Sequence, residues 1–263
     1  MSAVATKTIR QTVRERQTVA GGSRLSLELR ADELGDAAIP AILMLPDATG
    51  EVPAALLIHG YTSRKETMSD SVGRALLDVG IASLAVDLPL HGERFVAGRS
   101  RGGMQPLELM RTWKLALTEC ALGLRYLAAR PEIDRERRAV VGYSLGSFLG
   151  VTIAARERAA VKAVVLAAGG DLPDDLPFGM MIRAVVDPIV AVRSLDATPL
   201  LMVHGRRDRT VTAAQARRLF DAAREPKEIR WWDAGHRLPA EAIGEAAGWL
   251  ADRLGVLGRR RTG

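Results

Sequence analysis

The sequence predicts an α/β protein in which helices cover both faces of a mostly parallel sheet. After Pro53, short runs that are apolar at every position alternate with stretches of helical periodicity, which is typical of parallel strands buried on both faces. Before Pro53, polar and apolar residues alternate, which indicates antiparallel strands leading into the sheet. No linker, repeat or low-complexity segment interrupts the chain, so we expect a single domain over residues 1–263.

The N-terminal part is punctuated by turn residues at Gly21-Gly22 and at 46–50. The strands predicted between these turns cover residues 8–18, 25–29 and 39–45. After Pro53, the predicted strands cover residues 54–58, 82–86, 138–142, 161–167, 200–203 and 228–232. The helices predicted between them cover residues 65–79, 107–129, 145–156, 179–192, 213–223 and 240–254. Pro188 lacks a backbone N–H, so it should kink or split the helix over 179–192.

Two connections are long, at 88–106 and at 169–198. Both leave from the carboxyl ends of predicted parallel strands, which is where ligands bind in open parallel sheets. We therefore expect them to form the walls of a pocket. The alternative is that both are ordinary surface excursions.

The motif G-x-S-x-G spans residues 142–146, between a predicted strand and a predicted helix. This context is typical of a nucleophile elbow, in which a serine sits on a tight, strained turn. Gly142 and Gly146 carry no Cβ, so the strand and the helix can approach closely on either side of Ser144. The turn should lift the Ser144 hydroxyl above the sheet edge, with the Leu145 N–H pointing into the same space.

A serine nucleophile needs a base, and His236 is the candidate among the four histidines. His236 follows the last predicted strand on a loop and is preceded by Gly235, which lets the turn form. The other three end buried strands or lie in a long loop: His59, His204 and His91.

The acid that orients the base should follow the strand between Ser144 and His236, and Asp208 follows strand 200–203. Asp233 is too close to His236 along the chain, and Asp87 ends an earlier strand. The alternative for Asp208 is a turn residue paired with neighbouring arginines.

The developing oxyanion needs two hydrogen-bond donors. We expect them to be the backbone N–H of Tyr61, in the loop after the first parallel strand, and that of Leu145. The alternative for the Tyr61 side chain is packing at the pocket rim.

Composition excludes several other classes of protein. The net charge is +6, but the basic residues are scattered among acidic ones and only 259–261 forms a run, so we expect no nucleic-acid partner. The longest uncharged run, 139–155, is interrupted by polar residues, so no membrane span is expected, and residues 1–11 lack the apolar stretch of a signal peptide. The single cysteine, Cys120, suits packing in a helix and a cytoplasmic location. The oligomeric state is not predicted.

Five segments together resemble the α/β-hydrolase superfamily, and within it the small serine esterases of the dienelactone-hydrolase and prolyl-oligopeptidase-like branch. These segments occur in family order at residues 57–63, 87–94, 142–146, 204–208 and 234–236. The resemblance implies a sheet of the eight-stranded type with no large cap. It also implies that Ser144 is the nucleophile, His236 the base and Asp208 the acid, with the Tyr61 and Leu145 amides as the oxyanion hole.

The chain departs from this branch at two places. Dienelactone hydrolases have a cysteine where this chain has Ser144. Many relatives read D-x-x-G-H-G-x-S where this chain has Leu90 and Arg94, so the substrate contacts of those relatives are not carried over to these positions.

The resemblance implies a serine hydrolase that cleaves carboxylic esters with small or medium acyl chains, through an acyl-enzyme intermediate and without a cofactor. A metal site built from Asp87, His91 and Glu93 is not expected, because their spacing matches no standard site. The alternatives are a thioesterase, an acyl-amide hydrolase or peptidase using the same residues, or a hydrolase-fold binding module without activity.

Overall fold

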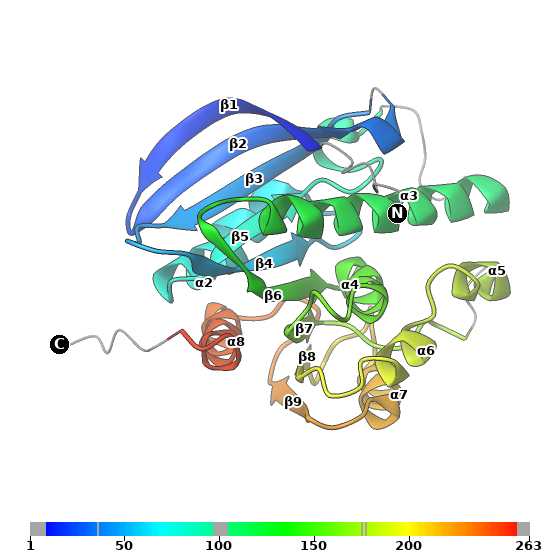
Figure 1. Ribbon diagram of the computed structural model, residues 1–263. Helices are drawn as coiled ribbons and strands as arrows, with labels where there is room; N and C mark the ends of the chain where they lie inside the picture. Colours follow the sequence, from blue (N-terminus) through cyan, green and yellow to red (C-terminus); the bar gives the residue numbers. More distant parts are fainter. Residues whose placement is uncertain (1–8, 36, 97–104, 175, 177, 257–263) are drawn as a thin grey trace, which may run out of the picture.

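The computed structural model describes residues 9–35, 37–96, 105–174, 176 and 178–256, and within them nine strands form one sheet (Figure 1). The strand order is β1-β2-β3-β5-β4-β6-β7-β8-β9. The strands are β1 (Ile9–Val19), β2 (Gly22–Ala31), β3 (Ile39–Pro46), β4 (Val52–Ile58), β5 (Ala82–Val86), β6 (Ile133–Tyr143), β7 (Ala163–Ala167), β8 (Leu200–Gly205) and β9 (Lys227–Trp232).

The six strands from β4 to β9 run parallel, whereas β1, β2 and β3 pair in antiparallel fashion and β3 joins the parallel part beside β5. This arrangement confirms the predicted fold class. The described sheet has one strand more than the eight-stranded type, because β1 adds an antiparallel edge beside β2. Strand β6 also begins earlier than predicted, at Ile133. Its charged first half contains an irregularity in the pairing with β4, and regular pairing begins at Arg138.

Helices cover both faces of the sheet (Figure 1). They are α1 (Lys65–Met68), α2 (Arg74–Asp78), α3 (Pro106–Ala128), α4 (Leu145–Arg156), α5 (Gly179–Arg183), α6 (Pro188–Arg193), α7 (Ala213–Ala222) and α8 (Ala240–Arg253). The helix predicted over 65–79 contains a π-helical turn at Ser69–Gly73 between α1 and α2. The helix predicted over 179–192 is split at Pro188, as expected, and the Asp187 side chain caps α6.

Two apolar layers hold these helices on the sheet. Along β4, Leu56 and Ile58 face the layer that contains α3, α4 and α7, whereas Leu57 faces the layer that contains α2 and α8. This two-sided burial is why the central strands are apolar at every position. No helix in the described ranges is long and apolar enough to cross a membrane.

Candidate active site

Ser144 lies between the end of β6 and the start of α4, with φ 53° and ψ −115°. This is an uncommon conformation for a residue other than glycine, and the surrounding backbone holds it there. A Cβ on Gly146 would lie 1.9 Å from the carbonyl oxygen of Ile58, and one on Gly142 would lie 2.2 Å from the carbonyl oxygen of Gly146. The glycines of the motif are therefore required by close backbone packing.

The three residues predicted to act together lie within hydrogen-bond distance of one another. His236 Nε2 is 2.9 Å from Ser144 Oγ, and His236 Nδ1 is 2.8 Å from Asp208 Oδ2. They come from three different loops, since Ser144 follows β6, Asp208 follows β8 and His236 follows β9. Parallel strands bring these loops to one edge of the sheet.

The Asp208 side chain is held by backbone N–H groups of residues that follow it in the chain. Its Oδ1 accepts hydrogen bonds from Thr210 N at 2.8 Å and from Val211 N at 3.1 Å, while its side chain is buried. The two rival acids lie elsewhere. Asp233 is an exposed residue paired with Arg207, and Asp87 is bonded to Lys65.

His59 and His204 have structural partners. His59 Nδ1 donates to the carbonyl oxygen of Gly60 at 2.8 Å, and its Nε2 accepts from Leu88 N at 3.1 Å, an arrangement that requires the neutral ring. His204 Nε2 is 2.9 Å from the carbonyl oxygen of Val211, and burial lowers the pKa of this histidine. Sequence reasoning did not identify that His59 joins the turn before Tyr61 to the loop after β5.

The turn that carries Tyr61 passes beside the serine. A Cβ on Gly60 would lie 3.3 Å from Ser144 Cβ, and Tyr61 follows it in the chain. Leu145, the first residue of α4, lines the same cavity as Tyr61 and Ser144. The two predicted oxyanion donors therefore belong to the backbone on either side of the nucleophile.

A cavity of about 310 Å³ opens beside Ser144. Its lining comes from both long connections and from α3 and α4, and is mainly apolar: Tyr61, Leu88, Pro89, Leu90, His91, Leu109, Thr112, Trp113, Ala116, Ser144, Leu145, Phe148, Leu149, Leu172, Pro173, Leu176, Ile182, Thr210 and Val211. The described parts of both connections line this cavity, as predicted. The glycine pair at 102–103 lies outside the described residues, as does the basic run at 259–261.

The wall formed by 88–94 is held by buried charges. Lys65 Nζ is 3.0 Å from Asp87 Oδ2, 2.6 Å from Glu93 Oε1 and 2.7 Å from Glu66 Oε1, and its side chain is 1% exposed. Asp87 and Glu93 therefore bind an ammonium group. Among the described residues no cluster of three or more His, Cys, Asp or Glu side chains is arranged to hold a metal ion.

A second ion pair fastens the same wall to α3. Arg94 donates to both carboxylate oxygens of Glu119, at 2.5 and 2.8 Å, and to the carbonyl oxygen of Asp87 at 3.2 Å. Burial raises the pKa of Glu119, although Arg94 opposes this effect. Arg94 is one of the two positions at which the chain departs from the related motif, and this contact assigns it a structural role.

The fold resembles those of several solved proteins, among them esterases. A cold-adapted esterase from an Arctic intertidal metagenomic library superposes with a TM-score of 0.71 at 19% identity, covering 91% of this chain and 97% of that one. TT1662 from Thermus thermophilus gives 0.70 at 22% identity, covering 94% and 98%, and acetyl xylan esterase 1 from Thermoanaerobacterium sp. JW/SL YS485 gives 0.72 at 18% identity, covering 97% and 89%. At these identities the likeness establishes the fold alone.

Part of the sequence also matches the model of a known protein family. Residues 118–244, which include the serine, the acid and the histidine, match the model of the serine hydrolase family FSH1. This match covers just under half of the chain, which as a whole has the α/β-hydrolase fold. No curated protein sequence matches the chain at a significant level.

Proposed function

We propose that this hydrolase is a carboxylesterase that cleaves small-molecule esters with small or medium acyl chains. The observation that carries the proposal is the hydrogen-bonded series Ser144–His236–Asp208 at the mouth of an apolar cavity. Such a series activates a serine for attack on a carbonyl carbon. An intact series of this kind is not needed in a binding module without activity.

In the proposed mechanism, Ser144 Oγ attacks the ester carbonyl while His236 Nε2 takes its proton. The protonated ring then gives this proton to the leaving alcohol as the carbon–oxygen bond breaks, which leaves an acyl group on Ser144. A water molecule, deprotonated by His236, attacks the acyl carbon, and the proton returns to Ser144 as the acid leaves. Asp208 accepts the Nδ1–H throughout and stabilises the charged ring.

The negative charge on the carbonyl oxygen is assigned to the backbone N–H groups of Tyr61 and Leu145. Gly60, which precedes Tyr61, packs against Ser144 on one side, and Leu145 begins α4 on the other. Loss of one such donor lowers the rate by about 10²- to 10³-fold in other enzymes. They are therefore expected to supply a large part of the rate enhancement.

The lining of the cavity favours a substrate with an uncharged, apolar acyl group. None of its described lining residues is Asp, Glu, Lys or Arg, so the wall offers no counter-charge to an ionised acyl chain. The esterases with similar folds support an ester over an amide as the bond cleaved.

Cys120 is buried within α3, which supports its packing role. The cytoplasmic location stays a prediction.

The test is hydrolysis of a p-nitrophenyl ester series from acetate to laurate. Ser144→Ala and His236→Ala should each lower kcat by about 10⁶-fold, and Asp208→Asn by about 10⁴-fold because the amide no longer holds the ring in the required tautomer. Ser71→Ala removes only a hydroxyl that bonds the carbonyl oxygen of Thr67, so it is the control and should be fully active. Turnover that persists in Ser144→Ala would overturn the proposal.

Matched substrates separate the ester from its rivals. The acyl chain preferred in the ester series is presented as a thioester and as an anilide, and kcat/KM is measured for each. We expect the oxygen ester to give the highest value. A higher value for the thioester or the anilide would move the assignment to a thioesterase or an amide hydrolase using the same residues.

A further inference from the structure

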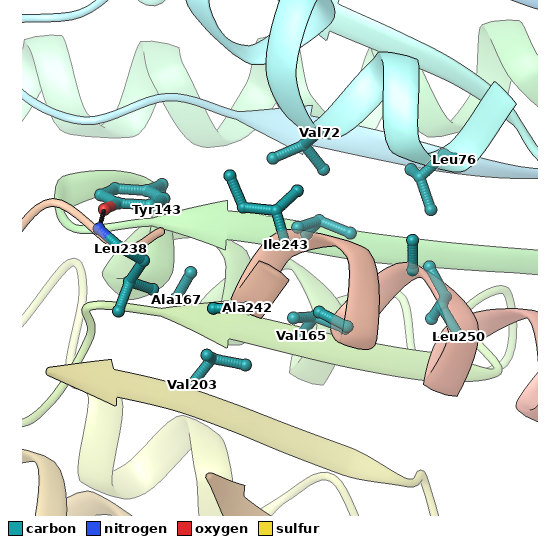
Figure 2. A pocket seen from close by; sticks show the side chains of 13 residues that line it. Val72, Leu76, Tyr143, Val165, Ala167, Val203, Leu238, Ala242, Ile243 and Leu250 are labelled. Carbon is teal, nitrogen blue, oxygen red and sulfur yellow. Dashed lines mark hydrogen bonds between the residues drawn. The ribbon is translucent and has the colours of Figure 1, made fainter. Parts of the chain in front are cut away.

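Tyr143 precedes the nucleophile in the chain, yet its side chain reaches the loop that carries the base. The Tyr143 hydroxyl donates a hydrogen bond to the carbonyl oxygen of His236 at 2.7 Å and accepts one from Leu238 N at 3.0 Å. Figure 2 shows the second of these bonds at the end of an apolar cavity between α8 and the sheet. One hydroxyl thus holds the backbone of the 236–238 segment on both sides of Arg237.

The other end of the same loop is fastened differently. Arg207 N donates to the carbonyl oxygen of Ala234 at 2.9 Å, and a Cβ on Gly205 would lie 2.2 Å from the carbonyl oxygen of Gly235. The segment before His236 is therefore packed against the loop after β8, which also carries Asp208. The segment after His236 is held by Tyr143, which is bonded covalently to Ser144.

We propose that Tyr143 is a positioning residue that sets the distance between His236 and Ser144, an inference that rests on the proposed function. The serine and the hydroxyl that anchors its base belong to adjacent residues. Movement of the 236–238 segment would lengthen the 2.9 Å contact between His236 Nε2 and Ser144 Oγ. Proton transfer requires this contact to be short.

A tyrosine at the edge of a core can also serve for packing alone. The partners of the hydroxyl favour the specific role, because it donates to the carbonyl oxygen of His236 and accepts from Leu238 N at the same time. The side chains that line the cavity beside its ring are apolar, including Val203, Ala242 and Ile243, and they offer no replacement for the hydroxyl.

The first test is Tyr143→Phe, which keeps the ring and removes only the hydroxyl. We expect kcat for the preferred ester to fall by about 10- to 100-fold with KM unchanged, because a displacement on the order of 1 Å has effects of this size. The matched control is Tyr126→Phe, since Tyr126 is buried and its hydroxyl bonds Gln11 and Arg130 away from the site. The control should retain full activity.

Two readouts do not depend on the natural substrate. The rate of Ser144 labelling by a fluorophosphonate probe should fall in Tyr143→Phe by the same factor as kcat. The Nδ1 proton of His236, which is hydrogen-bonded to Asp208, should give a low-field proton NMR signal in the wild type, and faster exchange with water should broaden it in the variant. A change in packing alone would alter neither.

Rescue separates positioning from a general loss of folding. Para-aminophenylalanine at position 143 keeps a hydrogen-bonding group in place of the hydroxyl, and it should restore most of the labelling rate and the NMR signal. Unchanged labelling in Tyr143→Phe, or no restoration by this variant, would overturn the inference. If Ser144→Ala retains ester turnover, the proposed function fails instead. If fluorophosphonate does not label wild-type Ser144, both fail.

Discussion

The two sides of the active-site cavity are fastened by different forces. On the side of the nucleophile, contact between backbone atoms holds the turn around Ser144, and Ser147 Oγ adds hydrogen bonds to the carbonyl oxygens of Gly142 and Ala167, both at 2.9 Å. On the opposite side, buried ion pairs hold the wall at 87–94 through Lys65 and Glu119.

This difference distinguishes the placement of the serine from the shape of the cavity. Close backbone packing tolerates little change and suits atoms that must be placed within tenths of an ångström. Ion pairs hold a loop that contributes shape and apolar surface to the cavity, and the geometry of the nucleophile does not depend on them. Substitutions on the two sides should therefore have distinct effects, and three of them measure the contrast.

The largest effect is expected at the elbow, for Gly146→Ala. The added methyl group would overlap the carbonyl oxygen of Ile58, an atom of the central strand that has no room to move. We expect the free energy of unfolding to fall by more than about 4 kcal/mol, or the chain not to fold. Urea denaturation followed by circular dichroism measures this change.

A second glycine provides the matched control for Gly146→Ala. Gly248 also lies in a helix, but a Cβ there has open space around it. Gly248→Ala should raise the stability by about 0.5–1 kcal/mol because alanine favours the helix. Equal destabilisation by both substitutions would mean that close packing at the elbow is not the cause.

On the wall, Lys65→Met leaves the buried carboxylate of Asp87 without its cation. Removal of one partner from a buried ion pair costs about 3 kcal/mol, so we expect the free energy of unfolding to fall by this amount. The activity toward p-nitrophenyl acetate should be preserved. KM for longer acyl chains should rise as the wall loosens. Lys162→Met, at an exposed lysine, should change the stability by less than about 0.5 kcal/mol. A similar result for both variants would remove the argument for a charge-held wall.

The smallest effect concerns Glu93, at the solvent-facing end of the same cluster. Its hydrogen bond with Lys65, with help from Arg14, lowers the pKa of Glu93 below the ordinary value of a glutamate. A lowered acid pKa stabilises the fold above the unfolded-state value, and this contribution disappears as the pH falls through the folded-state pKa. Glu93→Gln should therefore cost up to about 1 kcal/mol at pH 7 and nothing near pH 2. Urea midpoints at both pH values measure this, and a constant difference would contradict it.

The sequence predicted the elements of the fold and the residues on the chemical side of the site because their signals are local. Gly142, Ser144 and Gly146 form one short motif, and Asp208 and His236 each follow a recognisable apolar strand. Parallel pairing then brings these strand ends to one edge, whatever the details of the loops.

The charged wall could not be predicted in the same way. Lys65 and Glu93 are 28 residues apart, Arg94 and Glu119 are 25 apart, and each looks like an ordinary surface charge in the sequence. The role of the Tyr143 hydroxyl was equally hidden, because its partners are backbone atoms more than 90 residues away. The π-helical turn at Ser69–Gly73 left no periodicity that distinguishes it from the α-helix around it.

The neutral ring of His59 is bonded on one side to the turn before Tyr61 and on the other to the loop after β5. An acyl chain that presses on Leu88 therefore pushes against a residue tied directly to the oxyanion side of the site. His59 thus connects the wall of the cavity to the turn that carries the proposed oxyanion donor Tyr61, although it takes no part in the proposed chemistry. Efforts to widen the cavity for bulkier esters would have to leave this ring in place to keep the turnover rate.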